Sequence, residues 1–245
     1  MRIAALYDIH GNLPAMEAAL HSCREEGPSA VVIGGDLAAG PLPAQTLDIL
    51  MALGQWAVPI KGDADRALVA AYDLRMAGRM AELAAFDPIV AWASGRITRS
   101  HRDFLANLPD HVVLSADELG EIYFCHGTPG AEHAVVTPST PEEDIQAMFS
   151  SVSQRICVVG RAHLAFDRKA GGQRIVDPGS VGLPCEDAPG AYWAIFGPEV
   201  GLRRTEFNLA RAARRIERSG MPGARTFAKE RVLAAPGRET AGDPA

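Results

Sequence analysis

The residues best suited to chemistry in this chain stand directly after short apolar runs. Asp8 and His10 come first, behind apolar residues 3–6, and Asn12 follows them. Taken alone, this acid–histidine pair is equally typical of a polar turn in which Asn12 caps the next helix. The pattern recurs, however. Other metal-capable residues follow later apolar runs, each with a glycine close by: Asp36, Asp63, His126 and His163.

Recurrence at the ends of apolar runs has a structural meaning. In parallel α/β sheets the carboxyl ends of the strands lie along one edge, and ligands gather there. Side chains that are far apart in the sequence can therefore converge at that edge. Mixed imidazole and carboxylate groups suit divalent transition metals better than Mg²⁺ or Ca²⁺. The spacing thus predicts a metal site assembled from several strand ends.

Strand and helix patterns alternate through the first half of the chain. The sequence predicts strands over residues 3–7, 30–33 and 56–60, and helices over residues 13–26, 43–53, 65–78 and 100–108. Asn12 is the expected N-cap of the first helix. A β-α-β-α-β order implies parallel strands joined by right-handed crossovers.

The second half is rich in short strands joined by glycine-bearing turns. Strands are predicted over residues 112–115, 121–125, 156–160, 165–170, 174–177, 192–196 and 202–207. One helix interrupts them, with Thr140 as its expected N-cap and Pro141 at its first position. A basic amphipathic helix over residues 209–219 follows. The order of elements predicts an α/β fold with two packed sheets flanked by helices.

Six short motifs resemble those of the calcineurin-like metallophosphoesterases, specifically the compact bacterial phosphodiesterase type. The family pattern runs D-x-H, G-D, G-N-x-D, H-G, G-H-x-H and N-P-G-S-V-G. Here the corresponding segments are Asp8-Ile9-His10, Gly35-Asp36, Gly62-Asp63-Ala64-Asp65, His126-Gly127, Gly160-Arg161-Ala162-His163 and Asp177-Pro178-Gly179-Ser180-Val181-Gly182. The similarity extends from residue 1 to about residue 233.

The resemblance implies a four-layer α/β/β/α sandwich and two neighbouring metals. Asp8, His10 and His163 would hold the first metal, and Asp36 would bridge to the second. The second would be completed by Asp63, His126 and the first histidine of G-H-x-H. Two cations about 3.5–4 Å apart clamp a phosphate and activate a water as the nucleophile. The chemistry of the ligands favours Mn, Fe, Zn or Ni.

Three positions depart from the family pattern, and two of them fall in the second metal site. The family asparagines are replaced by Asp63 and Asp177, and the first histidine of G-H-x-H is replaced by Arg161. An arginine is always charged and cannot ligate a metal. Asp63 and Arg161 either form a salt bridge in place of the second cation, or Asp63 ligates while Arg161 grips a phosphate oxygen. One tight metal site is expected, and the sequence does not decide whether a second metal binds.

Ala64 narrows the expected reaction. Many relatives carry a histidine here that acts as a general acid on the leaving group. Without it, the sequence favours substrates with good leaving groups, namely phosphodiesters or pyrophosphate-linked nucleotides. Asp36, Arg161 and His126 are the predicted catalytic residues. Lys61 and Arg66 are further candidates for a phosphate contact. The rival hypothesis is a degenerate relative that binds a metal or a phosphate ligand without turnover.

Composition limits the partners. The 245-residue chain carries a net charge of −6, which disfavours nucleic acid as the main partner and leaves a small phosphorylated substrate, such as a nucleotide. No run reaches the ~18 apolar residues of a membrane span. With four cysteines and no CxxC spacing, the chain is expected to be cytoplasmic. Residues 1–235 are predicted to form one domain, and residues 236–245 a disordered tail.

Overall fold

The first of two mixed sheets carries the amino-terminal strand at its centre. The computed structural model describes residues 1–130 and 134–234, so the predicted tail lies outside the described residues. The strand order is β10-β9-β1-β2-β3. The strands are β1 (Ile3–Leu6), β2 (Ala30–Gly34), β3 (Ala57–Ile60), β9 (Ala191–Phe196) and β10 (Val200–Thr205). β1, β2 and β3 are parallel, as predicted, whereas β9 and β10 join as an antiparallel pair.

The second sheet is built from the middle of the chain, in the order β4-β5-β6-β8-β7. Its strands are β4 (His111–Ala116), β5 (Gly120–Cys125), β6 (Ile156–Val158), β7 (Phe166–Ala170) and β8 (Gln173–Asp177). The three inner strands are parallel, and each outer strand pairs antiparallel with its neighbour. The ends of β5 and β6 therefore lie at the same edge of this sheet.

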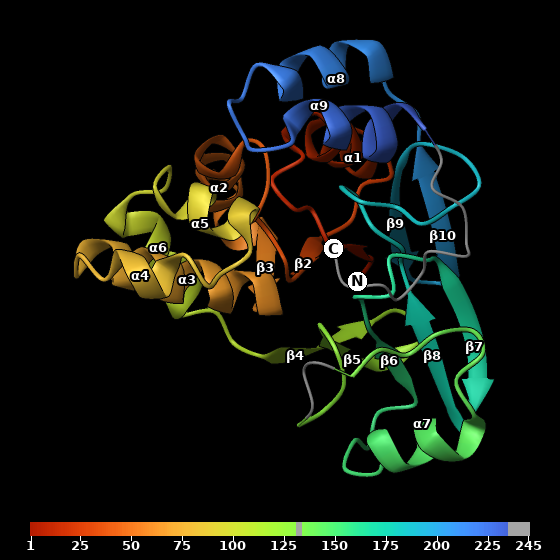
Figure 1. The fold of residues 1–245 in the computed structure, drawn as a ribbon. Coiled ribbons are helices and arrows are strands. Elements are labelled where there is room, and N and C mark those ends of the chain that lie inside the picture. The colour runs from red at the N-terminus through yellow and green to blue at the C-terminus, as the bar shows by residue number, and fades with distance from the viewer. Residues whose placement is uncertain (131–133, 235–245) are drawn as a thin grey trace.

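Helices cover the outer faces of both sheets (Figure 1). α7 (Glu142–Met148) lies against the second sheet, and the other helices surround the first. These are α1 (Leu13–Glu25), α2 (Pro43–Ala52), α3 (Asp63–Met76), α4 (Met80–Leu83), α5 (Pro88–Ser94), α6 (Arg99–Ala106), α8 (Leu209–Glu217) and α9 (Ala224–Phe227). A 3₁₀ turn, η1 (Gly54–Trp56), precedes β3, and a π-helical turn, η2 (Ala228–Leu233), follows α9.

Three apolar clusters define four layers. One fills the space between the first sheet and helices such as α1, and includes Leu6, Met16 and Trp193. A second lies between the two sheets, where Tyr7 and Phe124 are fully buried. A third joins the second sheet to α7. Because β1 is covered on both faces, its sequence is continuously apolar rather than alternating. The predicted α/β/β/α sandwich is confirmed.

The structure differs from the predicted elements in several places. Thr140 does not cap α7, because its hydroxyl oxygen accepts a bond from the backbone N–H of Thr137 at 2.9 Å and Pro141 is the N-cap. α3 begins at Asp63 rather than Asp65, and the short helices α4, α5 and α9 were not predicted. The prediction for Asn12 is confirmed, since its side chain accepts from the N–H of Ala15. In the described ranges, none of the helices is both long and apolar enough to cross a membrane.

Candidate metal centre

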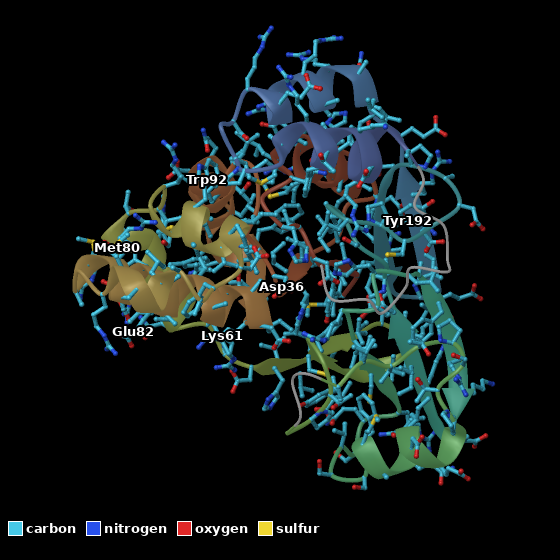
Figure 2. All side chains as sticks on the ribbon, in the orientation of Figure 1. Asp36, Lys61, Met80, Glu82, Trp92 and Tyr192 are labelled. Carbon is cyan, nitrogen blue, oxygen red and sulfur yellow. The ribbon has the colours of Figure 1, made fainter. Side chains whose placement is uncertain are left out.

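Four strand ends deliver the predicted ligands to one place between the sheets. Asp8 and His10 follow β1, Asp36 follows β2, His126 follows β5, and His163 lies just beyond β6. All five side chains are buried, and Asp8 is fully inaccessible. Figure 2 shows Asp36 near the centre of the view, far from the peripheral Met80 and Glu82 of α4. The structure therefore brings together residues from both halves of the chain.

The backbone at this centre is held in an unusual conformation. Asp8, His10, Asp36, Arg161 and His163 have φ angles of 52°, 45°, 52°, 73° and 56°. Left-handed backbone is uncommon for residues that carry a Cβ, and such strain persists where surrounding structure imposes it, often at functional sites. The strain turns the chain sharply after each strand, so that these side chains face inward.

The first ligand group consists of Asp8, His10 and His163. Nε2 of His163 lies 3.3 Å from Oδ1 of Asp8, and Nε2 of His10 lies 3.9 Å from the same oxygen. The two imidazole nitrogens are 3.4 Å apart. Three donor atoms thus surround one small volume, which is the arrangement that a single divalent cation requires.

The second ligand group consists of Asp8, Asp36 and His126. Nε2 of His126 lies 3.3 Å from Oδ2 of Asp36 and 3.8 Å from Oδ1 of Asp8. Nε2 of His10 is 3.6 Å from Oδ2 of Asp36, which links the two groups. Asp8 belongs to both groups. The bridging role that the resemblance implies for Asp36 stays a prediction.

Two buried polar atoms at this centre are available to ligate a metal. Oδ1 of Asp8 and Nε2 of His126 have no hydrogen-bond partner in the part of the chain that the structure describes. Buried polar atoms nearly always have a bonding partner, so a bound metal would supply the partner that these two atoms lack. Nδ1 of His126 donates to the carbonyl of Gly34 at 2.8 Å, which directs its Nε2 toward the carboxylates. The donor set suits a divalent transition metal.

The three histidines have different pKa values because their surroundings differ. Burial lowers the pKa of His10 to about 4, so its imidazole is neutral at pH 7. His126 is also disfavoured as a cation by burial, but the Asp36 and Asp8 carboxylates outweigh this and raise its pKa to about 10. Asp8 likewise raises the pKa of His163 to about 10. A metal must therefore displace a proton from each of these two imidazoles that ligates it.

Arg161 and Asp63 form an ion pair beside these groups. The Arg161 guanidinium donates to the Asp63 carboxylate, and the two side chains are 22% and 16% exposed. Of the two alternatives left open by the sequence, the structure contains the salt bridge. Neither ligand group found in the described residues includes Asp63. The assignment of Asp63 as a metal ligand stays a prediction.

The fold and these strand-end ligands agree with the result of comparisons with known proteins. A family model described as the calcineurin-like phosphoesterase superfamily domain matches residues 1–197. The chain belongs to this superfamily. An uncharacterised protein of Methanocaldococcus jannaschii is 22% identical over 240 residues, covering 90% of this chain and 93% of that protein.

Solved structures show the same fold. A metallophosphoesterase from Sphaerobacter thermophilus is similar with a TM-score of 0.75 at 23% identity, covering 96% of this chain and 99% of that chain. A hypothetical protein from Pyrococcus horikoshii has a TM-score of 0.78 at 21% identity, covering 100% and 99%. Two mixed five-stranded sheets flanked by helices form this chain's α/β sandwich, the fold that it shares with the Sphaerobacter thermophilus structure.

Asp65 is a supporting residue to which the sequence reasoning gave no role, although it completes the Gly62-Asp63-Ala64-Asp65 motif. Its carboxylate accepts from the N–H groups of Asp36, Leu37 and Gly62, each at 2.9 Å. Burial, with help from the charge of Asp36, raises the pKa of Asp65 to about 7. Gly62 is required because a Cβ would lie 2.2 Å from Oδ1 of Asp36. Asp65 thereby fixes the turn that presents Asp36.

The turn over residues 177–182 lies beneath the site, as expected for a structural element. The hydroxyl of Ser180 donates to the carbonyl of Asp8 at 2.7 Å, and the N–H of Gly182 donates to the same carbonyl at 2.9 Å. A Cβ on Gly182 would lie 1.9 Å from the carbonyl oxygen of Ile9. Asp177 is fully buried, and burial raises its pKa well above the usual range. This packing holds the Asp8 turn in place.

Lys61 and Arg66 do not join the ligand groups. Nζ of Lys61 donates to the carbonyl of Ala106 at 2.9 Å, and Arg66 forms an ion pair with Asp110 at 2.7 Å. These contacts tie the region around the start of α3 to the end of α6 and to the segment that follows it. Their contact with a substrate phosphate stays a prediction.

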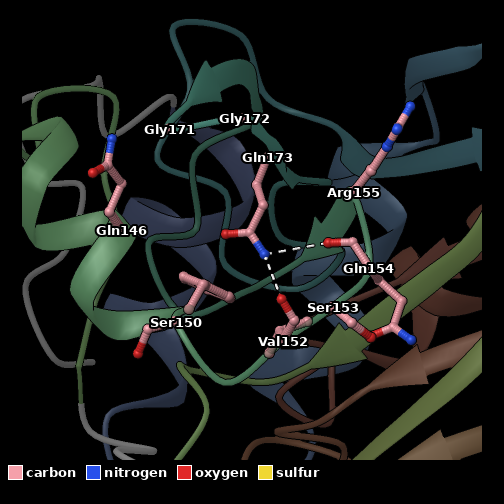
Figure 3. A pocket seen from close by; sticks show the side chains of 10 residues that line it. Gln146, Ser150, Val152, Ser153, Gln154, Arg155, Gly171, Gly172 and Gln173 are labelled. Carbon is pink, nitrogen blue, oxygen red and sulfur yellow. Dashed lines mark hydrogen bonds between the residues drawn. The ribbon is translucent and has the colours of Figure 1, made fainter.

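A pocket of about 510 Å³ lies away from the metal centre, between α7 and the β7–β8 turn (Figure 3). Its lining contains none of the candidate ligands, and Gln173 is occupied by bonds to the carbonyls of Val152 and Gln154. Arg155 is the charged side chain in this lining. The described lining of this pocket therefore contains no group of candidate metal ligands like the one around Asp8.

Proposed function

We propose that this protein hydrolyses phosphodiester or nucleotide pyrophosphate-type bonds in small substrates, such as nucleotides, with one tightly held divalent transition metal. The observation that carries the proposal is the shared position of Asp8, whose unpaired Oδ1 faces His10, His126 and His163 in a phosphoesterase fold. The net charge of −6 supports a small substrate over a nucleic acid.

Asp8, His10 and His163 would hold this metal, with Asp36 and His126 alongside. When bound, such a metal supplies positive charge against the phosphoryl oxygens and lowers the pKa of an attacking water. His10 is ready to ligate because its imidazole is already neutral. His126 is fixed by its bond to Gly34 and keeps Nε2 aimed at Asp36. Mn²⁺ is the first metal to test, followed by Fe, Zn and Ni.

Arg161 supplies a fixed positive charge at the edge of this centre. Its guanidinium is held by Asp63 and remains partly exposed, so a phosphoryl oxygen could approach it. Preorganised cations stabilise the charge that develops during phosphoryl transfer. We infer that Arg161 acts on the transition state in place of a second tight metal.

Ala64 supports a substrate with a good leaving group. Its side chain carries no proton to donate, and the side chains of Lys61 and Arg66, which flank it in the sequence, are engaged with other segments. An activated diester or a phosphoanhydride needs little protonation of its leaving group.

The cysteines bear on where the protein is located. All four are buried and free, which is compatible with a cytoplasmic location.

A substrate panel tests this proposal. Bis(p-nitrophenyl) phosphate, a dinucleoside polyphosphate and a sugar phosphate are incubated with the metal-free protein and with added Mn²⁺. Hydrolysis of the first two substrates should depend on Mn²⁺ and exceed that of the sugar phosphate. Fastest turnover of the sugar phosphate would contradict the proposed substrate preference.

The ion pair of Arg161 with Asp63 favours a second candidate, a protein that binds a metal or phosphate ligand without efficient catalysis. The pair neutralises two side chains at the place expected for a second metal. The same panel separates the candidates. Tight Mn²⁺ binding without hydrolysis of any substrate would favour the binding function.

A further inference from the structure

A small cavity opens directly from the candidate metal centre. Its volume is about 170 Å³, and His10 and Ala64 form part of its wall. His10 belongs to the first ligand group, and the backbone N–H of Ala64 donates to Asp36 at 2.8 Å. A group attached to a phosphate at the metal centre would therefore extend into this cavity.

The rest of the cavity wall is largely apolar. Ile89 and Val90 come from α5, Leu183 from the segment after β8, and Phe227 from α9. An apolar wall favours an apolar ligand, because a buried hydroxyl or phosphate without a partner would cost several kcal/mol. Among the described residues of the wall, Arg231, from η2, and Asp87 are charged. Asp87 caps α5, where its Oδ1 accepts from the N–H groups of Ile89 and Val90, so the guanidinium of Arg231 is the cation that can reach a ligand.

The size of the cavity limits what it can hold. Pockets for drug-sized ligands measure about 300–1,000 Å³, so 170 Å³ suits only part of a substrate. An apolar cavity of about 150 Å³ accepts a benzene ring. Phe227 and the guanidinium of Arg231 are both groups that stack on flat aromatic rings.

The outer wall comes from a part of the chain that the family match does not include. Phe227 and Arg231 lie beyond residue 197, in the helical segment drawn in blue at the top of Figure 1. Phe227 packs against the apolar cluster that joins α8 to η2. The cavity is therefore completed by this carboxyl-terminal helical segment rather than by the matched domain alone.

We propose that this cavity binds a flat aromatic ring, such as an aryl group or a nucleobase, carried by the phosphorylated substrate. The ring packs between Ile89 and Phe227, and Arg231 stacks on it or reaches its edge. This inference rests on the proposed function, because the phosphoryl group anchors the substrate at the metal centre. The carboxyl-terminal helices thus determine which organic group is accepted.

Calorimetric titration of the Mn²⁺-loaded protein with phenylphosphonate and methylphosphonate tests the proposal. Both probes carry the same phosphonate group, and they differ only in the ring. Phenylphosphonate should bind about tenfold more tightly, which corresponds to about 1.4 kcal/mol. Equal affinities would overturn the ring site while leaving the phosphoryl site in place.

Two variants locate the preference in this cavity. Phe227→Ala removes the aromatic wall, and Ile89→Trp fills the space; each should reduce the preference for phenylphosphonate to less than about threefold. Phe207→Ala is the matched control, because Phe207 packs on the same carboxyl-terminal cluster but does not line the cavity. A preference retained by a folded Ile89→Trp variant would overturn the proposal.

Methylphosphonate separates this inference from the proposed function. It should bind all three variants as it binds the unchanged protein, because its contacts are with the metal centre. If neither phosphonate binds the Mn²⁺-loaded protein and bis(p-nitrophenyl) phosphate is not hydrolysed, both the function and the ring site are wrong. Hydrolysis of the diester with no preference for the ring overturns the ring site alone.

Discussion

The guanidinium of Arg161 donates a hydrogen bond to the carboxylate of Asp63, which stands 98 residues earlier in the chain. Asp63 begins α3, and Arg161, which has a left-handed backbone, stands two residues before the candidate ligand His163. The pair places an acid and a base at the two positions where the motif pattern that this sequence resembles has an asparagine and a histidine. It joins the edge of the metal centre to the first turn of α3.

Removal of Arg161 should lower activity without loss of the first metal. In Arg161→Ala, the partly buried Asp63 loses its cation, and charge on the phosphoryl group is no longer stabilised. We expect about a 100-fold fall in kcat with bound Mn²⁺ retained. Kinetics and metal analysis check this. Arg102→Ala, which breaks the pair with Asp73 on α3, is the control and should keep its activity.

Restoration of the family pattern should raise the number of metals bound. The double variant Asp63→Asn with Arg161→His replaces the ion pair by a neutral amide and a neutral imidazole, both of which can ligate. Calorimetric titration with Mn²⁺ should move from one tight site per chain toward two. Two equal tight sites in the unchanged protein would contradict the single-metal proposal.

Loss of His10 should remove both metal and activity. His10 is neutral at pH 7 and lies close to Asp8, Asp36 and His163, so His10→Ala removes a ready ligand. Activity should fall at least about 100-fold. His21→Ala, at an exposed position of α1, is the control. Wild-type activity of His10→Ala in Mn²⁺-replete buffer would show that the metal centre is assigned wrongly.

Metal uptake should release protons and strengthen as the pH rises. The pKa of His163 is about 10 in the metal-free protein, against an ordinary value of 6.5, and only the neutral imidazole can ligate. Below pH 10 each bound metal must therefore displace this proton, and the affinity should rise about tenfold per pH unit. Calorimetry at pH 7.5 in buffers of different ionisation enthalpy should detect at least one proton released. A pH-independent affinity between pH 7 and 9 would argue against this ligand.

Truncation of Asp65 should destabilise the fold and loosen Asp36. Asp65→Ala leaves three buried backbone N–H groups without their acceptor, namely those of Asp36, Leu37 and Gly62. At about 1 kcal/mol or more for each group, the free energy of unfolding should fall by about 3 kcal/mol. Urea denaturation measures the change. Glu143→Ala on the exposed face of α7 should cost less than about 1 kcal/mol.

The sequence by itself determined the order of the strands and of the longer helices, and most of the residues that converge. The apolar run of β1 predicts a strand covered on both faces, because local pattern reports burial. The ligands follow from their places at strand ends, since parallel topology gathers those ends at one edge. Asn12, with its side-chain bond to Ala15, shows that a helix cap can be predicted when its donor and acceptor are close in sequence.

Only the tertiary structure decided which partners these residues take. Thr140 bonds to Thr137 instead of capping α7, since a threonine hydroxyl can satisfy a nearby turn as well as a helix end. The pairing of Arg161 with Asp63, the shared position of Asp8 and the contribution of Phe227 to the cavity all join segments that are far apart in sequence. A sequence pattern records which face of an element is buried. Which side chain lies opposite is set by how the sheets and helices pack, and this becomes defined only when the whole chain is folded.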